Sequence, residues 1–299
     1  MLLLAGCKSL LPGSATGDRS DRPVVPKPTD ISFAQLAQRY NARFEHFDRL
    51  RASLTVSYTN RDEEGKEHHV QANGQLAVRL PDRLMCRITH IGRAGTIMWA
   101  GSNRQRYWLY DASDETAARV YHGSHARYRP DLHGVAWPLH PLDLPWLMGL
   151  VPLEPAREEP APRVDHDDEG RYVVRLARSP VRLFIDARSY EPVRIEVFDD
   201  EGQVALVSRL SKPKRVELER QPPGRWPYVA TRVEIRRPER QEQLRMTLSV
   251  PRDTDIKDRW FDLDLLMNKV FKLPEDRRVD LDRRREAPPL PTISTGAPE

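Results

Sequence analysis

The feature that most constrains this 299-residue chain is a period-two pattern between Gln75 and Asp111. Apolar side chains alternate with polar ones in four short segments that are separated by turn signals such as Pro81-Asp82. This period is typical of antiparallel strands with one buried face and one hydrated face. A register shift of one residue would move the whole apolar set to the other face, so the pairing is strongly specified. The segment therefore predicts a four-stranded antiparallel meander.

The same alternation assigns side chains to the two faces of the meander. Arg79, Arg87 and Thr89 fall on the hydrated face, where their charges and hydroxyl can reach water. The apolar face is predicted to hold Leu76, Val78, Leu80, Leu84, Cys86, Ile88, Ile97, Trp99, Trp108 and Tyr110.

The rest of the chain continues the strand pattern. Ser32 is a candidate helix cap, and the apolar residues from Phe33 to Phe47 follow helical spacing. Further alternating segments run from Tyr172 to Val250, with a strong hairpin signal before Val204. We predict a mainly β fold with a few helices (α+β), built on one curved antiparallel sheet.

Marker residues in the meander carry a family resemblance. A strand that ends in Arg79-Leu80-Pro81-Asp82-Arg83, a second strand, a turn and a strand that closes on Trp108-x-Tyr110-Asp111 resemble the LolA/LolB lipoprotein-carrier superfamily. The resemblance extends from Phe33 to about Leu263. It implies an incomplete β-barrel whose concave side holds lipid acyl chains, with the N-terminal helix and a short lid helix on that side.

The resemblance also implies positions for the lid helix and the cavity. The candidate lid is His140–Leu150, in which Pro145 is either a kink or part of the first turn of a shorter helix. An apolar lid and a core plug would look the same in sequence. The predicted cavity lining is Leu76, Val78, Leu84, Ile88, Ile97, Trp99, Trp108, Tyr110, Val193, Ile195, Val233 and Leu248, all of which would equally suit a closed core. In LolB-like proteins a projecting loop enters the membrane, and Ile91 lies near that position or else is a buried turn residue.

The N-terminus contains a bacterial lipobox, Leu4-Ala5-Gly6-Cys7, in which Cys7 would receive the lipid. Residues 1–7 are interpreted as a truncated lipoprotein signal, and the alternative is an ordinary thiol after an apolar tip. Residues 8–30 are predicted to be a flexible tether, residues 31–270 the LolA/LolB-like domain, and residues 271–299 a disordered tail. Lys8 and Ser9, in place of an acidic residue, follow Cys7, and by resemblance to proteobacterial sorting rules this suggests the outer membrane, facing the periplasm.

Charge and motifs narrow the range of functions. The net charge is +4, but basic residues alternate with acidic ones, so we expect no nucleic-acid site. No apolar run is long enough to span a bilayer. Templates for phosphate-binding loops, nucleophile elbows and zinc helices are missing, so we predict no enzyme, no cofactor and no metal. His122, His125, His133 and His140 are interpreted as surface histidines.

These observations lead to one functional hypothesis and one alternative. The first is a membrane-anchored envelope lipoprotein that binds a lipid, or the acyl chains of a lipoprotein, in an apolar cavity. The alternative is a non-catalytic interaction or sensor module of the same fold that binds a protein partner.

Overall fold

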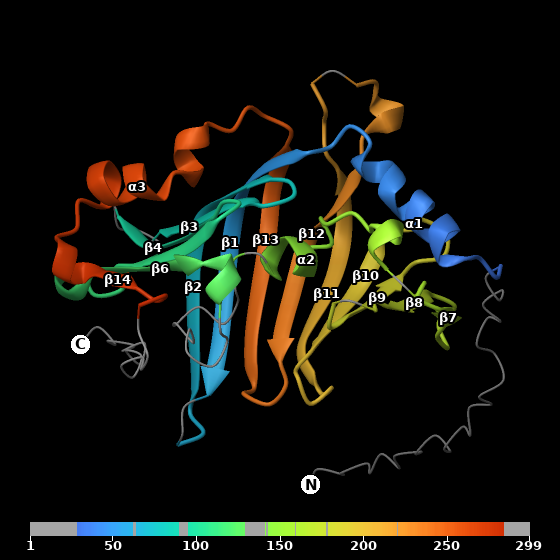
Figure 1. The fold of residues 1–299 in the computed structure, drawn as a ribbon, viewed down its shortest axis with the longest axis horizontal. Helices are drawn as coiled ribbons and strands as arrows, with labels where there is room; N and C mark the ends of the chain where they lie inside the picture. The colour runs from blue at the N-terminus through green and yellow to red at the C-terminus, as the bar shows by residue number, and fades with distance from the viewer. Residues whose placement is uncertain are drawn as a thin grey trace, which may run out of the picture.

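The computed structural model describes residues 29–61, 64–89, 95–128, 141, 143–158, 160–177, 179–219 and 221–283. Its main element is one open sheet of fourteen strands in the order β14-β6-β5-β4-β3-β2-β1-β13-β12-β11-β10-β9-β8-β7. Neighbouring strands are antiparallel except β14, which runs parallel to β6. The sheet is strongly curved and does not close (Figure 1). The predicted single, incomplete antiparallel barrel is therefore confirmed.

The sheet consists of two meanders. The strands of the first are β1 (Arg49–Arg61), β2 (Glu67–Arg79), β3 (Arg83–Thr89), β4 (Thr96–Ser102), β5 (Arg106–Asp111) and β6 (Arg119–Ser124). The strands of the second are β7 (Val164–His166), β8 (Tyr172–Arg175), β9 (Val181–Ile185), β10 (Pro192–Phe198), β11 (Val204–Arg215), β12 (Tyr228–Arg237) and β13 (Glu242–Arg252). Pairing of β1 with β13 joins the meanders edge to edge.

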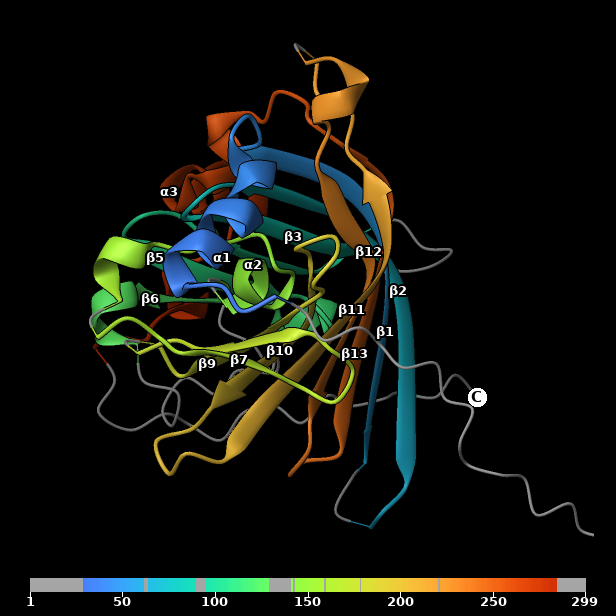
Figure 2. The same cartoon turned by 90° about the vertical axis from the view of Figure 1, so that its right-hand side faces the viewer.

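Two helices lie on the concave side of the sheet (Figure 2). Helix α1 (Phe33–Asn41) begins with a capping box, in which Ser32 accepts a hydrogen bond from the Gln35 backbone and the Gln35 side chain accepts one from Ser32. Helix α2 (Asp143–Leu147) lies in the connection between β6 and β7. Leu144 and Leu147 of α2 are buried in one cluster with residues of the concave face such as Leu76. Helix α2 therefore covers part of the concave side.

The largest apolar cluster fills the space between the concave face and the helices. Phe33, Leu36, Ala37 and Tyr40 of α1 are buried in it, together with concave-face residues from both meanders. At about 25 cal/mol per Å² of buried apolar surface, this layer is the main source of stability. The cluster holds the sheet in its curved shape.

A second apolar cluster lies on the opposite, convex face of β3, β4 and β5. The C-terminal segment covers this face with a short helix α3 (Leu263–Leu265), a π-helical turn (Leu266–Phe271) and residues around Ile256. Beneath this segment, Ala77 and Met85 are buried. The alternation predicted that this face is hydrated, and for this part of the sheet the prediction is wrong.

The side chains of β4 that face the concave side differ from the prediction, because the pairing of β3 with β4 contains a β-bulge. Ile88 pairs with Met98 and Thr89 with Thr96, so Ile97 is the extra residue. A bulge of one residue reverses the alternation that follows it. Trp99 pairs with Arg87, and Trp108 and Tyr110 follow on β5, so all three lie in the convex-face cluster. The prediction that they share a face with Leu76 is wrong.

The predicted disordered tail begins too early. Residues 271–283 are ordered, and they include strand β14 (Arg278–Asp280), which pairs with β6. Val279 and Leu281 are buried against Tyr107 and Tyr121. Pairing with β6 and hydrogen bonds from the Ser124 N–H to Asp282 also hold this segment. Residues 284–299 lie outside the described residues.

Gly101 provides a test of the convex-face packing. A Cβ atom there would lie 2.4 Å from Cζ2 of the fully buried Trp108 ring. We expect Gly101→Ala to lower the free energy of unfolding by about 1–3 kcal/mol through overpacking, measured by urea denaturation. Gly224→Ala is the control, because nothing lies within 4 Å of its added Cβ, and its effect should be below about 0.5 kcal/mol. Equal effects of the two changes would contradict the packing described here.

Candidate functional site

The concave face is the candidate binding site, and α2 is its central element. Leu144, Leu147 and Leu150 are at most 2% exposed and belong to the main apolar cluster. The helix spans Asp143–Leu147, shorter than the predicted His140–Leu150, and Pro145 lies in its first turn. Proline is tolerated there because the backbone N–H groups of the first turn have no partner within the helix. In this structure α2 is a plug and not an open lid.

Hydrogen bonds hold the α2 segment in place. Ser208 of β11 donates from Oγ to the carbonyl oxygen of Leu147 at 2.6 Å. Asn41, at the end of α1, donates to the carbonyl oxygen of Leu153 at 2.6 Å and accepts from its N–H at 2.8 Å. Tyr40 donates to the carbonyl oxygen of Val151 at 3.2 Å. These bonds fix the backbone after α2 to α1 and to the sheet.

The twelve predicted lining residues divide into three groups. The structure brings together on the concave face Leu76, Val78, Leu84, Ile88, Ile97, Ile195, Val233 and Leu248. Val193 is half-buried and lines a hollow at the rim of that face. Trp99, Trp108 and Tyr110 lie on the convex side. Two other predicted site residues, the lipidation site Cys7 and the membrane-contact residue Ile91, lie outside the described residues.

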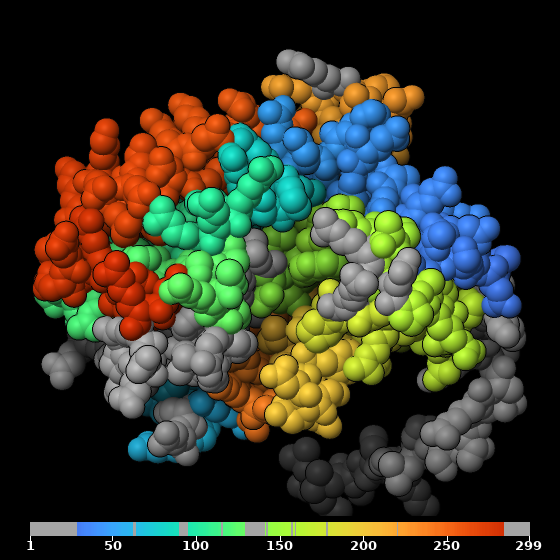
Figure 3. Space-filling view, viewed as in Figure 1, coloured from blue at the N-terminus to red at the C-terminus, as the bar shows by residue number. Residues whose placement is uncertain are grey.

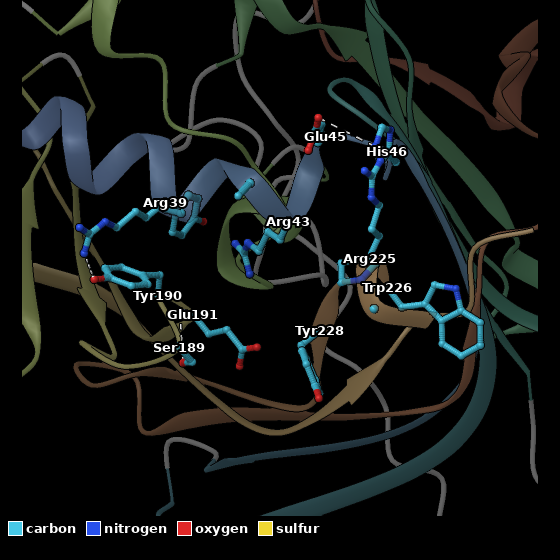
Figure 4. Close-up of a pocket in the computed structure, with 14 residues that line it drawn as sticks. Arg39, Arg43, Glu45, His46, Ser189, Tyr190, Glu191, Arg225, Trp226 and Tyr228 are labelled. Atoms are coloured by element: carbon cyan, nitrogen blue, oxygen red, sulfur yellow. Dashed lines mark hydrogen bonds and ion pairs between the residues drawn. The ribbon is translucent and has the colours of Figure 1, made fainter. Parts of the chain in front are cut away.

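A polar hollow opens at the rim, between α1 and the second meander. It has a volume of about 370 Å³ and is lined by Arg39 and Tyr40 of α1, by Arg43, by Ser189–Glu191 and by Arg225–Tyr228. A smaller hollow of about 180 Å³ shares four of these residues and adds Met148, Val193 and Leu210. Figure 4 shows the side chains around the larger hollow. The rim is therefore charged, and it becomes apolar toward α2.

Arg43 lies where the two hollows meet. Its guanidinium donates to the carbonyl oxygen of Gly149 and lies over the rings of Tyr40 and Phe44, 4.3 and 4.5 Å from their centroids. Its Nε is buried and has no hydrogen-bond partner among the described residues. Arg43 is therefore held by the Gly149 carbonyl and two aromatic rings, and it lines both hollows.

Glu191 faces the same hollow from the turn between β9 and β10. Burial raises the pKa of this carboxyl group, and the nearby positive charge of Arg43 opposes the shift only in part. No ion pair within 4.0 Å involves Glu191 in the part of the chain that the structure describes. The charged form of Glu191 is thus poorly stabilised by the protein alone.

This charged rim was not predicted from the sequence. Arg39 and Arg43 are four residues apart near the end of a helix and therefore lie on one side of it, which was a readable signal. Glu191 and Arg225 had no such signal, because they lie in separate turns that only the fold brings together.

Neither the histidines singled out in the sequence nor a membrane-spanning helix contributes to the site in the described part of the chain. Burial lowers the pKa of His122, which lies on β6, while His133 and His140 lie outside the described residues. Across the described ranges, no three metal-ligating side chains are grouped. In the same ranges, no helix is long and apolar enough to cross a bilayer.

The sequence matches no protein-family model, and no curated protein matches it significantly. Solved structures do match. A LolA superfamily protein from Nitrosomonas europaea superposes with a TM-score of 0.51 at 14% identity, covering 79% of this chain and 100% of that one. The chain has the LolA-type fold.

Two further structures agree with this assignment. A domain provisionally assigned as an outer membrane lipoprotein-sorting protein from Vibrio parahaemolyticus has a TM-score of 0.52 at 15% identity, covering 79% of this chain and 97% of that one. A DUF1329 family protein from Desulfovibrio piger has a TM-score of 0.52 at 13% identity, covering 78% of this chain and 97% of that one. At such identities the LolA-type likeness establishes the fold alone.

Leu147 tests whether α2 is part of the core. Its side chain is fully buried, so we expect Leu147→Ala to lower the free energy of unfolding by about 2–5 kcal/mol in urea denaturation. Val70→Ala is the control, since Val70 is 38% exposed and should contribute less than about 1 kcal/mol. If Leu147→Ala were as mild as the control, α2 would not be packed as a plug.

Glu191 gives a pH-dependent prediction. Because its folded pKa is raised, the folded state binds the proton more tightly than the unfolded chain does. The stabilisation from this group is therefore complete below its unfolded pKa and is lost as the pH rises through the folded pKa. We expect Glu191→Gln to unfold at a higher urea concentration than the wild type at pH 7, with the gap closing at pH 3.5. A gap that widened toward low pH would contradict the raised pKa.

Proposed function

We propose that this protein is an envelope carrier that binds the acyl chains of a lipid or of a lipoprotein against its concave face. One observation carries the proposal: a curved, apolar sheet face is covered by short helices and not by a second sheet. A five-residue helix can be displaced at a smaller cost in lost contacts than a whole sheet layer. The LolA-type fold of lipoprotein-sorting proteins supports the same proposal.

The energetics of such a carrier are favourable. An acyl chain would replace the apolar side chains of α2, so one set of apolar contacts is exchanged for another. Moving a chain from water into an apolar site gains about 0.8 kcal/mol per methylene. A lipid that leaves a bilayer has already made that gain, so the exchange is nearly neutral. Small differences in affinity can then set the direction of transfer.

The anchor and the location belong to the same proposal. Lipidation of Cys7 would hold the domain at a membrane by way of residues 8–30, and two or more acyl chains give stable anchoring. We place the protein at the outer membrane, facing the periplasm, with Ile91 on a loop that contacts the membrane. We propose no catalytic role and no cofactor.

The second candidate function is an interaction or sensor module of the same fold. The filled interior favours this candidate. The apolar residues of α1 and α2 are buried in one cluster with those of the concave face. In the space-filling view, the blue surface of α1 lies against the green surface around α2 and β7–β9 (Figure 3). A module of this kind would bind its protein partner without opening the core.

Native mass spectrometry separates the two candidates. We expect the full chain, purified from membranes, to carry lipid, and Val193→Asp to lower the bound fraction about tenfold by placing a charge beside Met148 in the smaller hollow. Val70→Asp, on an exposed part of β2, should keep the lipid. Circular dichroism checks that both variants fold. A folded wild-type protein that never carries lipid would instead support the interaction module.

Anchorage is tested separately. We expect metabolic labelling with an alkyne palmitate analogue to tag the protein and to place it in the membrane fraction. Cys7→Ala should abolish both the label and the membrane association, while Cys86→Ala should keep both, because Cys86 is fully buried. Labelling that survives Cys7→Ala would refute the anchor.

A further inference from the structure

We propose that the rim hollow next to α1 binds a zwitterionic headgroup, with its phosphate at Arg43 and its ammonium at Glu191. The inference rests on the proposed carrier function and specifies its cargo: a lipid with a phosphoethanolamine-type headgroup.

The phosphate side of the site is the cationic wall. Arg39, Arg43 and Arg225 line the hollow, and in the described part of the chain none of them forms an ion pair with a carboxylate. Arg39 donates to the hydroxyl of Tyr190, and Arg225 contacts Nε2 of His46 at 3.4 Å. Arg43 donates to the carbonyl oxygen of Gly149 and lines both hollows. Guanidinium groups bind phosphate oxygens strongly, because both the charge and the N–H geometry match.

The ammonium side is Glu191 and its aromatic neighbours. Arg43, in the turn after α1, and Glu191, between β9 and β10, point into the same hollow (Figure 4). Burial penalises the free carboxylate, so a bound cation would stabilise its charged form. The rings of Tyr190 and Tyr228 also line the hollow, and aromatic faces attract ammonium groups.

The presence of both charges decides between an anionic and a zwitterionic ligand. Three guanidinium groups and the carboxylates of Glu45 and Glu191 surround one hollow. A phosphate alone would leave Glu191 unpaired in a half-buried position and would be repelled by it. A ligand that carries both charges satisfies Arg43 and Glu191 together.

The position of the hollow fits a lipid held by the concave face. The two hollows share Arg43, Ser189, Glu191 and Tyr228. From these shared residues the smaller hollow leads to Met148 and Leu210, which are buried in the main apolar cluster. A headgroup at the rim would therefore place its acyl chains toward α2.

The test measures headgroup binding without acyl chains. Glycerophosphoethanolamine, glycerophosphoglycerol and inorganic phosphate are titrated into the full chain by isothermal titration calorimetry at low salt. We expect glycerophosphoethanolamine to bind about tenfold more tightly than glycerophosphoglycerol, since only the former also pairs with Glu191. Arg43→Gln should weaken both by about tenfold or more. Inorganic phosphate that bound as tightly as glycerophosphoethanolamine would show a simple anion site and would overturn the proposal.

Glu191→Gln is the decisive variant, because the Glu191 side chain makes no hydrogen bond that the fold needs in the described structure. We expect this change to remove the preference, so that the two glycerophosphodiesters bind equally. Arg209→Gln and Glu239→Gln, both at exposed positions, are the matched controls and should leave the preference intact. A preference that survives Glu191→Gln would overturn the proposal.

Short-chain lipids distinguish this proposal from the carrier function. If dihexanoyl phosphatidylethanolamine and dihexanoyl phosphatidylglycerol bind equally well and the free headgroups do not bind, the headgroup site is refuted while carriage stands. If the headgroups bind with the expected preference but acyl chains add no affinity, carriage is refuted and the headgroup site stands.

Discussion

The pairing of β1 with β13 is the constraint on which the rest of this structure depends. It joins the first meander to the second through apolar pairs such as Leu54 with Leu248 and Val56 with Met246. These residues are far apart in sequence, so pairing β1 with β13 (the seam) costs loop-closure entropy. Burial of the paired residues in the main cluster offsets that cost. Without the seam there would be two small sheets, each with an exposed apolar face.

The position of the seam determines what covers the concave face. Because β1 and β13 lie in the middle of the order, β6 and β7 lie near opposite ends, and helix α2 in the connection between them packs on the concave face. That connection supplies Leu144 and Leu147 to the core. The proposed carriage would require acyl chains to take the space that apolar side chains of α2 occupy in this structure.

The sheet also buries apolar residues on its convex face. The bulge at Ile97 turns Trp99 outward, and the C-terminal segment from Ile256 to Leu273 buries it with Trp108. Asp264 pairs with Arg106 at 2.8 Å and helps to hold this segment against the sheet. Exposed pairs of this kind contribute little to stability, so the apolar contacts provide most of the attachment.

The sequence by itself determined the local structure, which consists of the strands from Gln75 to Asp111 and the capped helix after Ser32, and the repeated hairpin signals indicated an antiparallel sheet. Period-two alternation and capping depend only on neighbouring residues, so they can be read directly. Only the tertiary structure decided that Trp99 faces outward, that Val279 joins the sheet, and that α2 is a plug. It alone brought Arg43 and Glu191 to one hollow. A bulge, a strand edge and a meeting of distant turns depend on pairing across the chain, and no local pattern records them.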